Sequence, residues 1–155
     1  MRLEFQETIN SEDEHILFEG ISREDSLEKG FDPSKTFGIF LKNHAGETLG
    51  GITGCTLHGS LYIDLLFVQK EFQGQGWGSK LLLEAENWGK KRHCFFSTLN
   101  TMDFQALPFY QKLGYTVEFV REGYHKNSKM YLLRKNWDGV QRPHSPLSPS
   151  AHPSL

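Results

Sequence analysis

The chain has little of what marks a disulfide-rich or zinc-binding protein. Its 155 residues include two cysteines, Cys55 and Cys94, which lie in separate strand-like runs without C-x-x-C spacing. Neither a disulfide framework nor a zinc site is therefore expected. The seven histidines are scattered, with no pair at the spacing of metal ligands on a helix, and we predict no metal site.

Long apolar runs and long basic runs are also absent. No segment approaches the length of a membrane-spanning helix, and residues 1–10 lack the apolar region of a signal peptide. The formal net charge is -2, and we expect a surface of mixed charge. These features predict a soluble, cytoplasmic protein whose partner is neither nucleic acid nor a membrane.

Proline is scarce except at the end of the chain, where four of the six prolines lie among repeated serines. The preceding residues are numerous enough for one domain with a core, and they show no internal repeat. We therefore predict a single domain over residues 1–137 and a disordered Pro/Ser-rich tail over residues 138–155.

Glycine is concentrated in the segment QGQGWGS, residues 73–79, between an apolar run at 61–68 and a helical run at 80–91. Glycine at every second position lets the backbone turn tightly and bring N–H groups close to an anion, and the start of a helix adds the positive end of its dipole. The segment is typical of a pyrophosphate-binding loop. A glycine-rich turn that only reverses a strand into a helix is the alternative.

Two better-known glycine loops do not match this segment. The spacing differs from the G-x-G-x-x-G of dinucleotide-binding folds. A P-loop is excluded because Gly78, Ser79 and Lys80 stand in the wrong order for G-K-[ST].

The remaining pattern predicts alternating strands and helices. Residues 2–9 alternate as in an edge strand, and Ser11 opens a helix with a capping-box Glu14 that should end near Asp25 and bury an apolar face around residues 16–21. Further strands are expected at 36–41, 48–57 (with a bend or bulge), 61–68, 94–99, 115–121 and 129–134, and helices at 80–91, ending in a frayed turn at Gly89, and at 104–113.

The run at 61–68 is apolar on both faces, as in a central strand covered on both sides. Simple alternation would place its odd-numbered residues on one face and its even-numbered residues on the other. Asp64 is the polar exception, and we expect its surroundings to bury it.

Two motifs together resemble the GNAT superfamily of N-acetyltransferases. The first is [RQ]-x-x-G-x-G, beginning at Gln73 after the apolar strand, and the second is A-x-x-x-Y-x-x-x-G-[FY], carried by Ala106, Tyr110, Gly114 and Tyr115. The expected order of elements also matches over roughly residues 35–135. One departure is Asp103, where the family often has Asn.

The resemblance implies an α/β (α+β) fold with a mixed, mainly antiparallel sheet flanked by helices. The sheet would splay between the strands ending at Val68 and Leu99, with acetyl-CoA in the wedge and Asn100 in place of the family's Asn. Trp77 and Phe67 could instead be core fillers. The residues implied in acetyl-CoA binding are Leu66, Phe67, Val68, Gln73, Gly74, Gln75, Gly76, Trp77, Gly78, Ser79 and Asn100.

The implied reaction moves an acetyl group to a primary amine, which must lose a proton before it attacks. An alkylamine of pKa ~10.4 is neutral in only about one molecule in a few thousand at pH 7. Asp64 is the candidate base, acting after burial or through water, and a buried structural Asp is the alternative. Tyr110 is the candidate acid for the leaving thiolate, and a packing role is its alternative.

Neither cysteine has a His or a cation placed by sequence to activate it, so direct transfer is preferred. A non-catalytic acyl-CoA-binding module and, less favoured, a nucleotide-phosphate binder remain as other functions. The acceptor is left open between a small amine, an antibiotic and a protein lysine, as is a homodimer. Carboxylates that would suit a cationic acceptor, or form a solvated face, are Asp13, Asp25, Asp32 and Glu122.

Overall fold

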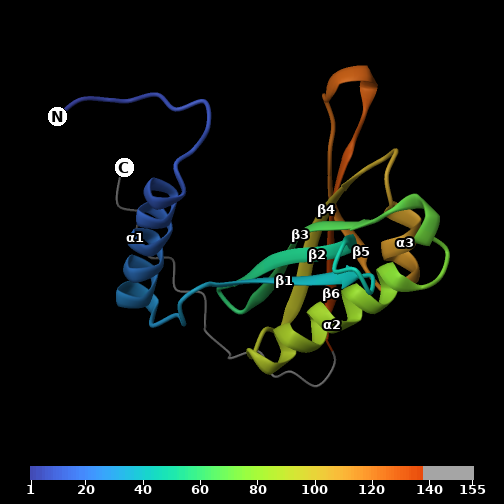
Figure 1. Cartoon of the computed structure of the whole chain (residues 1–155). Helices are drawn as coiled ribbons and strands as arrows, with labels where there is room; N and C mark the ends of the chain where they lie inside the picture. The colour runs from blue at the N-terminus through green and yellow to red at the C-terminus, as the bar shows by residue number, and fades with distance from the viewer. Residues whose placement is uncertain (138–155) are drawn as a thin grey trace.

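The computed structural model describes residues 1–137, so the predicted tail at 138–155 lies outside the described residues. In chain order the elements are α1 (Ser11–Lys29), β1 (Lys35–Lys42), β2 (Thr48–Leu57), β3 (Ser60–Val68), the 3-10 turn η1 (Lys70–Phe72), α2 (Trp77–Lys91), β4 (Phe96–Met102), α3 (Leu107–Lys112), β5 (Thr116–Arg121), the 3-10 turn η2 (His125–Asn127) and β6 (Met130–Asn136) (Figure 1).

The six strands form one sheet in the order β1-β2-β3-β4-β6-β5. All neighbours are antiparallel except β3 and β4, which are parallel and pair only from Ser60–Phe96 to Ile63–Leu99. Beyond that point the two strands separate. The predicted fold class, a mixed and mainly antiparallel sheet that splays open and is flanked by helices, is confirmed.

Helix α2 covers one face of the sheet and builds the core with it. Gly89 is not a frayed end as predicted, because α2 continues to Lys91 and Gly89 is buried. A Cβ at Gly89 would lie 2.9 Å from the ring of Trp137 and 3.2 Å from Leu61, so glycine here allows close packing. The most buried apolar core residues include Ile52, Leu61, Leu82, Ala85, Leu99 and Leu133.

A β-bulge interrupts the pairing of β2 with β3. The register passes from Thr53–Leu65 to Gly54–Ile63, which leaves Asp64 as the extra residue. The irregularity predicted for residues 48–57 is therefore present, with the extra residue on β3. Past the bulge the simple alternation is wrong, because Leu61 and Ile63 are buried before it and Val68 is buried after it.

The face opposite α2 has no helix over it within residues 1–137, so the predicted cover on both sides of β3 is wrong. Pairing places Phe40, Gly51 and Phe67 in one row across this face, and Asn100, Leu132 and Phe119 in another. Its large apolar side chains are far from buried: Phe40 is 53% exposed, Leu65 and Phe67 are 64% exposed, and Phe119 is 56% exposed. We call this surface the open face.

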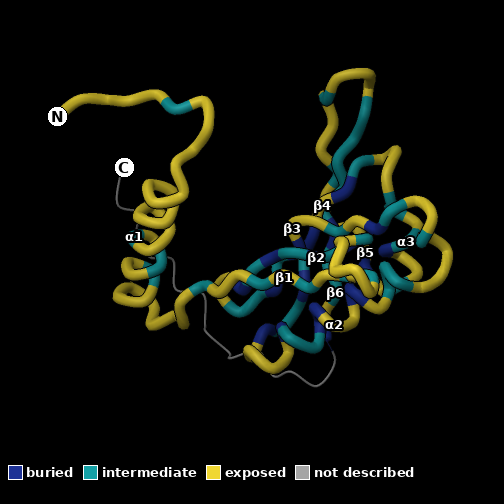
Figure 2. The backbone as a smooth tube through the Cα atoms, viewed as in Figure 1, coloured by how far each residue is buried: buried dark blue, intermediate teal, exposed yellow. Residues whose placement is uncertain are grey.

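The N-terminal region departs most from the prediction. Residues 1–10 form no strand, so the expected edge strand is wrong. Helix α1 begins one residue after the cap Asn10, whose side chain accepts a 2.8 Å hydrogen bond from Glu12 N, and it ends at the left-handed Gly30 rather than near Asp25. None of its residues is buried, so the expected burial of its apolar face is wrong (Figure 2).

Candidate active site

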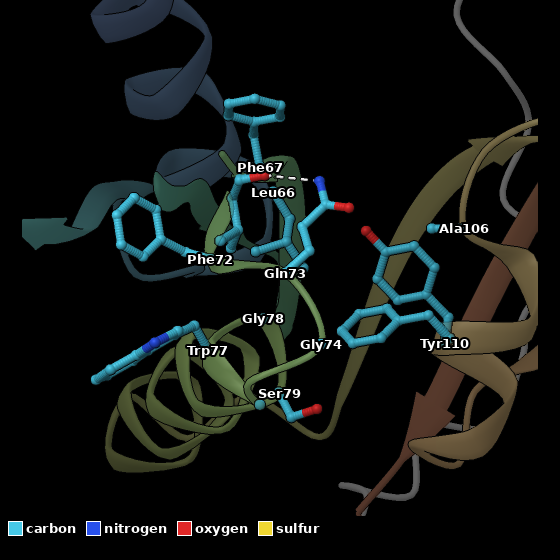
Figure 3. A pocket seen from close by; sticks show the side chains of 13 residues that line it. Leu66, Phe67, Phe72, Gln73, Gly74, Trp77, Gly78, Ser79, Ala106 and Tyr110 are labelled. Atoms are coloured by element: carbon cyan, nitrogen blue, oxygen red, sulfur yellow. Dashed lines mark hydrogen bonds between the residues drawn. The ribbon is translucent and has the colours of Figure 1, made fainter. Parts of the chain in front are cut away.

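A cleft of about 430 Å³ opens where β3 and β4 separate (Figure 3). The end of β3 and the loop that follows it into α2 meet α3 there, which lies further along the chain. The lining residues are Leu66, Phe67, Val68, Phe72, Gln73, Gly74, Gly76, Trp77, Gly78, Ser79, Ala106, Phe109 and Tyr110.

The glycine loop has the backbone shape needed to hold an anion. Gly74 and Gly76 have positive φ angles of 75° and 82°, which a residue with a Cβ adopts at a cost. Gly76 is the N-cap of α2 and offers no side chain to the helix start. The earliest helical bond, from Lys80 N to Gly76 O at 3.1 Å, lies beyond the N–H groups of residues 77–79, which remain for a ligand.

The other polar and small residues of the loop have packing roles that the motif did not reveal. The side-chain amide of Gln73 donates a 2.8 Å hydrogen bond to the carbonyl of Val68. A Cβ at Gly78 would lie 3.3 Å from the ring of Phe109. Gly78 therefore allows α2 and α3 to approach, whereas Gly74 and Gly76 shape the turn.

Tyr110 reaches the cleft from α3 and is 7% exposed. Its ring packs edge-on against Phe109 and Tyr115, with centroid distances of 5.1 Å and 5.9 Å. Figure 3 shows its hydroxyl directed toward the side of the cleft formed by Gln73. Burial raises the pKa of Tyr110 above its ordinary value, so the phenol keeps its proton over a wide pH range.

A buried polar network lies behind Tyr110. The hydroxyl of Tyr115 is 2.5 Å from Ser97 Oγ and donates to Glu86 Oε1 at 3.2 Å, and Lys135 Nζ donates to both Glu86 oxygens at 2.9 and 2.8 Å. Burial, with the Glu86 charge adding to it, raises the pKa of Tyr115. The network joins α2 to β4 and β6, and so holds the glycine loop and α3 on one frame.

Three predicted site residues are not among those that line the cleft. The Gln75 side chain donates to Glu71 O at 3.1 Å, and Asn100 is exposed and donates to the Tyr62 hydroxyl at 3.4 Å. Asp64 is exposed in the bulge, so its predicted burial is wrong. Burial is the main cause that raises the pKa of Tyr62, and the charge of Asp64 raises this pKa further.

The structure also adds residues that sequence reasoning missed. Phe72 and Phe109 line the cleft, and each stands directly beside a motif residue in the sequence. Glu86 was missed although it follows Leu82 by four residues and so shares the buried side of α2.

The carboxylates proposed for an acceptor differ in their contacts. Asp25 Oδ2 is 2.7 Å from His58 Nε2, and Glu122 Oε1 is 2.6 Å from Lys129 Nζ. The hydrogen bond and charge of Lys129 hold the pKa of Glu122 below its ordinary value. No group of three or more His, Cys, Asp or Glu side chains is placed for a metal ion within residues 1–137, and no helix there is long and apolar enough to cross a membrane.

The sequence and the structure both have known relatives. The chain is 37% identical over 87 residues to the acetyltransferase Atu2258 of Agrobacterium fabrum, an alignment that spans 56% of this chain and 64% of that one. It is 33% identical over 104 residues to the blasticidin-S acetyltransferase of Streptomyces morookaense, covering 66% of this chain and 76% of the relative. The chain therefore spans a little under two thirds of the first relative's length.

A crystal structure of a candidate acetyltransferase from Agrobacterium tumefaciens superimposes with a TM-score of 0.76 at 27% identity, covering 88% of this chain and all of that one. The family model described as "Acetyltransferase (GNAT) family" matches residues 3–115, which is more than half of the chain and includes the glycine loop, Tyr110 and Tyr115. The chain belongs to the GNAT family of acetyltransferases.

Proposed function

We propose that this protein moves an acetyl group from acetyl-CoA directly to the primary amine of a small molecule. The observation that carries the proposal is the cleft, in which the glycine loop and the Tyr110 side chain face the same space. A small-molecule acceptor is favoured over a protein lysine because a relative that is 33% identical is a blasticidin-S acetyltransferase.

The cleft suits acetyl-CoA in two respects. The N–H groups of the loop and of the first turn of α2 would hold the pyrophosphate. The pantetheine arm would lie along Leu66, Phe67 and Val68, where β3 has left its parallel pairing with β4 and its backbone can accept an extended chain. Acetyl-CoA supplies the thioester whose C–S bond is broken in the reaction.

Tyr110 is the proposed acid. When the amine nitrogen bonds to the thioester carbonyl carbon and the C–S bond breaks, the thiolate takes the phenolic proton and the product is an amide. With a thiol pKa near ~8.5 and a raised phenol pKa, this transfer is uphill in isolation, so it depends on Tyr110 lying beside the sulfur. The phenolate then regains a proton from solvent.

Asp64 is the proposed acceptor of the amine's proton, by way of water. Its exposed position in the bulge of β3 suits a relay to solvent better than direct abstraction inside a closed pocket. The cysteines support direct transfer, because a thiol that keeps its proton is a poor nucleophile. Burial raises the pKa of Cys94 to about 11, and burial is also the main cause that raises the pKa of Cys55.

Turnover separates this enzyme from a non-catalytic acyl-CoA-binding module. The experiment follows release of free thiol from acetyl-CoA while a panel of small amines, amine-bearing antibiotics and lysine peptides is added in turn. Steady release that depends on one amine class, with the acetylated amine found by mass spectrometry, is the expected result. Binding of acetyl-CoA without turnover on any acceptor would favour the binding module.

A further inference from the structure

Helix α1 has an apolar side that residues 1–137 leave largely exposed. It is 19 residues long and has no buried residue. Ile16 is 63% exposed, Leu17 is 69% exposed and Ile21 is 63% exposed. Most helical stability in proteins comes from packing of the apolar side of a helix and not from the helix propensity of its residues. The apolar side of α1 therefore needs a partner surface.

The contacts of α1 with its own chain hold it away from the open face. Near its C-terminal end, Asp25 pairs with His58 at 2.7 Å, and the ring of Phe31 lies 4.6 Å from the ring of His58. His58 belongs to the turn between β2 and β3, at one end of the sheet. From there α1 stands beside the sheet and not over it (Figure 1). While these contacts hold, α1 does not reach the open face of its own sheet, and the open face of a second copy can cover it.

The open face is a second apolar surface that residues 1–137 leave exposed. Phe40, Leu65, Phe67 and Phe119 lie on it, each more than half exposed. Two unpartnered apolar surfaces on one chain can cover each other in a pair of chains, because a two-fold axis makes the contact reciprocal.

The formal charge differs in sign between the N-terminal residues 1–33 and residues 34–137, whereas composition led us to expect a surface of mixed charge. Residues 1–33 carry ten Asp or Glu and three Lys or Arg, a formal charge of -7. Residues 34–137 carry eight Asp or Glu and thirteen Lys or Arg, a formal charge of +5. The acidic arm of one copy is therefore attracted to the basic body of another, in both directions at once.

We propose that the chain forms a two-fold dimer in which the N-terminal arm, residues 1–33, of each copy lies over the open face of its partner. The arm is large enough for such a contact, since a stable interface typically uses about 20–30 residues a side. Because Phe67 belongs both to the open face and to the cleft, the partner's arm forms part of the wall beside the cleft mouth. Each active site is then completed by two copies of the chain.

The first test is the mass of the full-length protein by light scattering after size-exclusion chromatography. Wild type should show twice the mass of the chain, and Leu17→Glu on the arm and Phe40→Glu on the open face should each show the mass of one chain. Leu83→Glu is the matched control, because Leu83 is 53% exposed but lies on α2, away from both surfaces. A monomeric wild type, or dimers that persist in both Leu17→Glu and Phe40→Glu, would overturn the proposal.

The second test asks which chain the arm covers. In a Cys55→Ser, Cys94→Ala background, one tagged chain carries Leu17→Cys and a differently tagged chain carries Phe40→Cys. A short bismaleimide reagent should join the two tags in the mixture and neither chain to itself. A chain carrying both cysteines that crosslinks only within itself would mean that the arm folds onto its own sheet, and the proposal would be wrong. Melting curves confirm that each variant is folded.

Discussion

The side-chain amide of Gln73 donates a 2.8 Å hydrogen bond to the backbone carbonyl of Val68. Val68 is the last residue of β3, and Gln73 is the first residue of the glycine loop. The bond therefore ties the loop to the strand that is proposed to hold the pantetheine arm. Through it the two halves of the proposed acetyl-CoA site keep a fixed separation.

Gln73→Leu should weaken acetyl-CoA binding about threefold to tenfold, because one hydrogen bond is typically worth about 0.5–1.5 kcal/mol. The measurement is a dissociation constant by calorimetry. Gln69→Leu is the control, since the Gln69 side chain also donates to a backbone carbonyl, that of Thr48 at 3.1 Å, but does not line the cleft. Equal effects of the two substitutions would show that the Gln73 bond has no special role in binding.

Gly76→Val should abolish the rise in melting temperature that acetyl-CoA causes. A β-branched residue is strained at a φ of 82°, and its side chain would project where the pyrophosphate is proposed to bind. Gly123→Val is matched in backbone strain, because Gly123 has a φ of 90° and open space around it, but it lies in the turn between β5 and β6. That variant should melt earlier than wild type and keep the full acetyl-CoA shift. A normal shift in Gly76→Val would disprove the proposed pyrophosphate site.

Tyr110→Phe should lower kcat by about 100-fold or more and leave the affinity for acetyl-CoA nearly unchanged, because it removes a proton and keeps the ring. Tyr115→Phe should lower the stability of the protein and leave kcat unchanged. The Tyr115 hydroxyl bonds to Ser97 and Glu86 in the buried network, so its loss should lower the melting temperature while folded enzyme turns over at the normal rate. Steady-state kinetics beside melting curves distinguish the two, and an unchanged kcat in Tyr110→Phe would remove it from the mechanism.

Asp64→Asn should reduce turnover most near neutral pH, by about 100-fold, and recover as rising pH supplies more free amine. Its melting temperature should stay close to that of wild type because Asp64 is exposed. A pH–rate profile of wild type and variant checks this, with Glu84→Gln as a control at an exposed carboxylate on α2. Should the two profiles run parallel, the amine's proton leaves without help from Asp64.

Cys94 should make the protein less stable as the pH rises from 9 to 11. Burial raises the pKa of its thiol from 9 to about 11, so above pH 9 the unfolded chain loses this proton and the folded chain keeps it. Its contribution to stability is complete below pH 9 and falls by at most about 1.4 kcal/mol per pH unit as the pH rises toward 11. Denaturant unfolding of wild type and Cys94→Ala across this range should show the two free energies of unfolding converge. Curves that stay a constant distance apart would contradict this account.

The parts that could be predicted from the sequence are those in which spacing decides the structure. Glycines at fixed intervals before a helix mark a tight turn, because glycine adopts the positive φ angles that other residues avoid, and the motif around Tyr110 places that residue opposite them. The bulge at Asp64 could not be predicted, because β3 is apolar on both sides and its pattern looks the same with or without an extra residue. Spacing likewise says that α1 has an apolar side but not which surface covers it, so its exposure was missed.

The short parallel contact between β3 and β4 has a consequence for motion. Strands β1, β2 and β3 form one antiparallel plate and β4, β6 and β5 form another, and the plates share a seam that runs only from Ser60–Phe96 to Ile63–Leu99. Such a seam can open without disturbing either plate, so its amide hydrogens should exchange with solvent sooner than those inside each plate. A ligand that fills the wedge contacts both plates at once, so its binding should slow amide exchange at Leu61 and Ile63, in the paired segment next to the wedge.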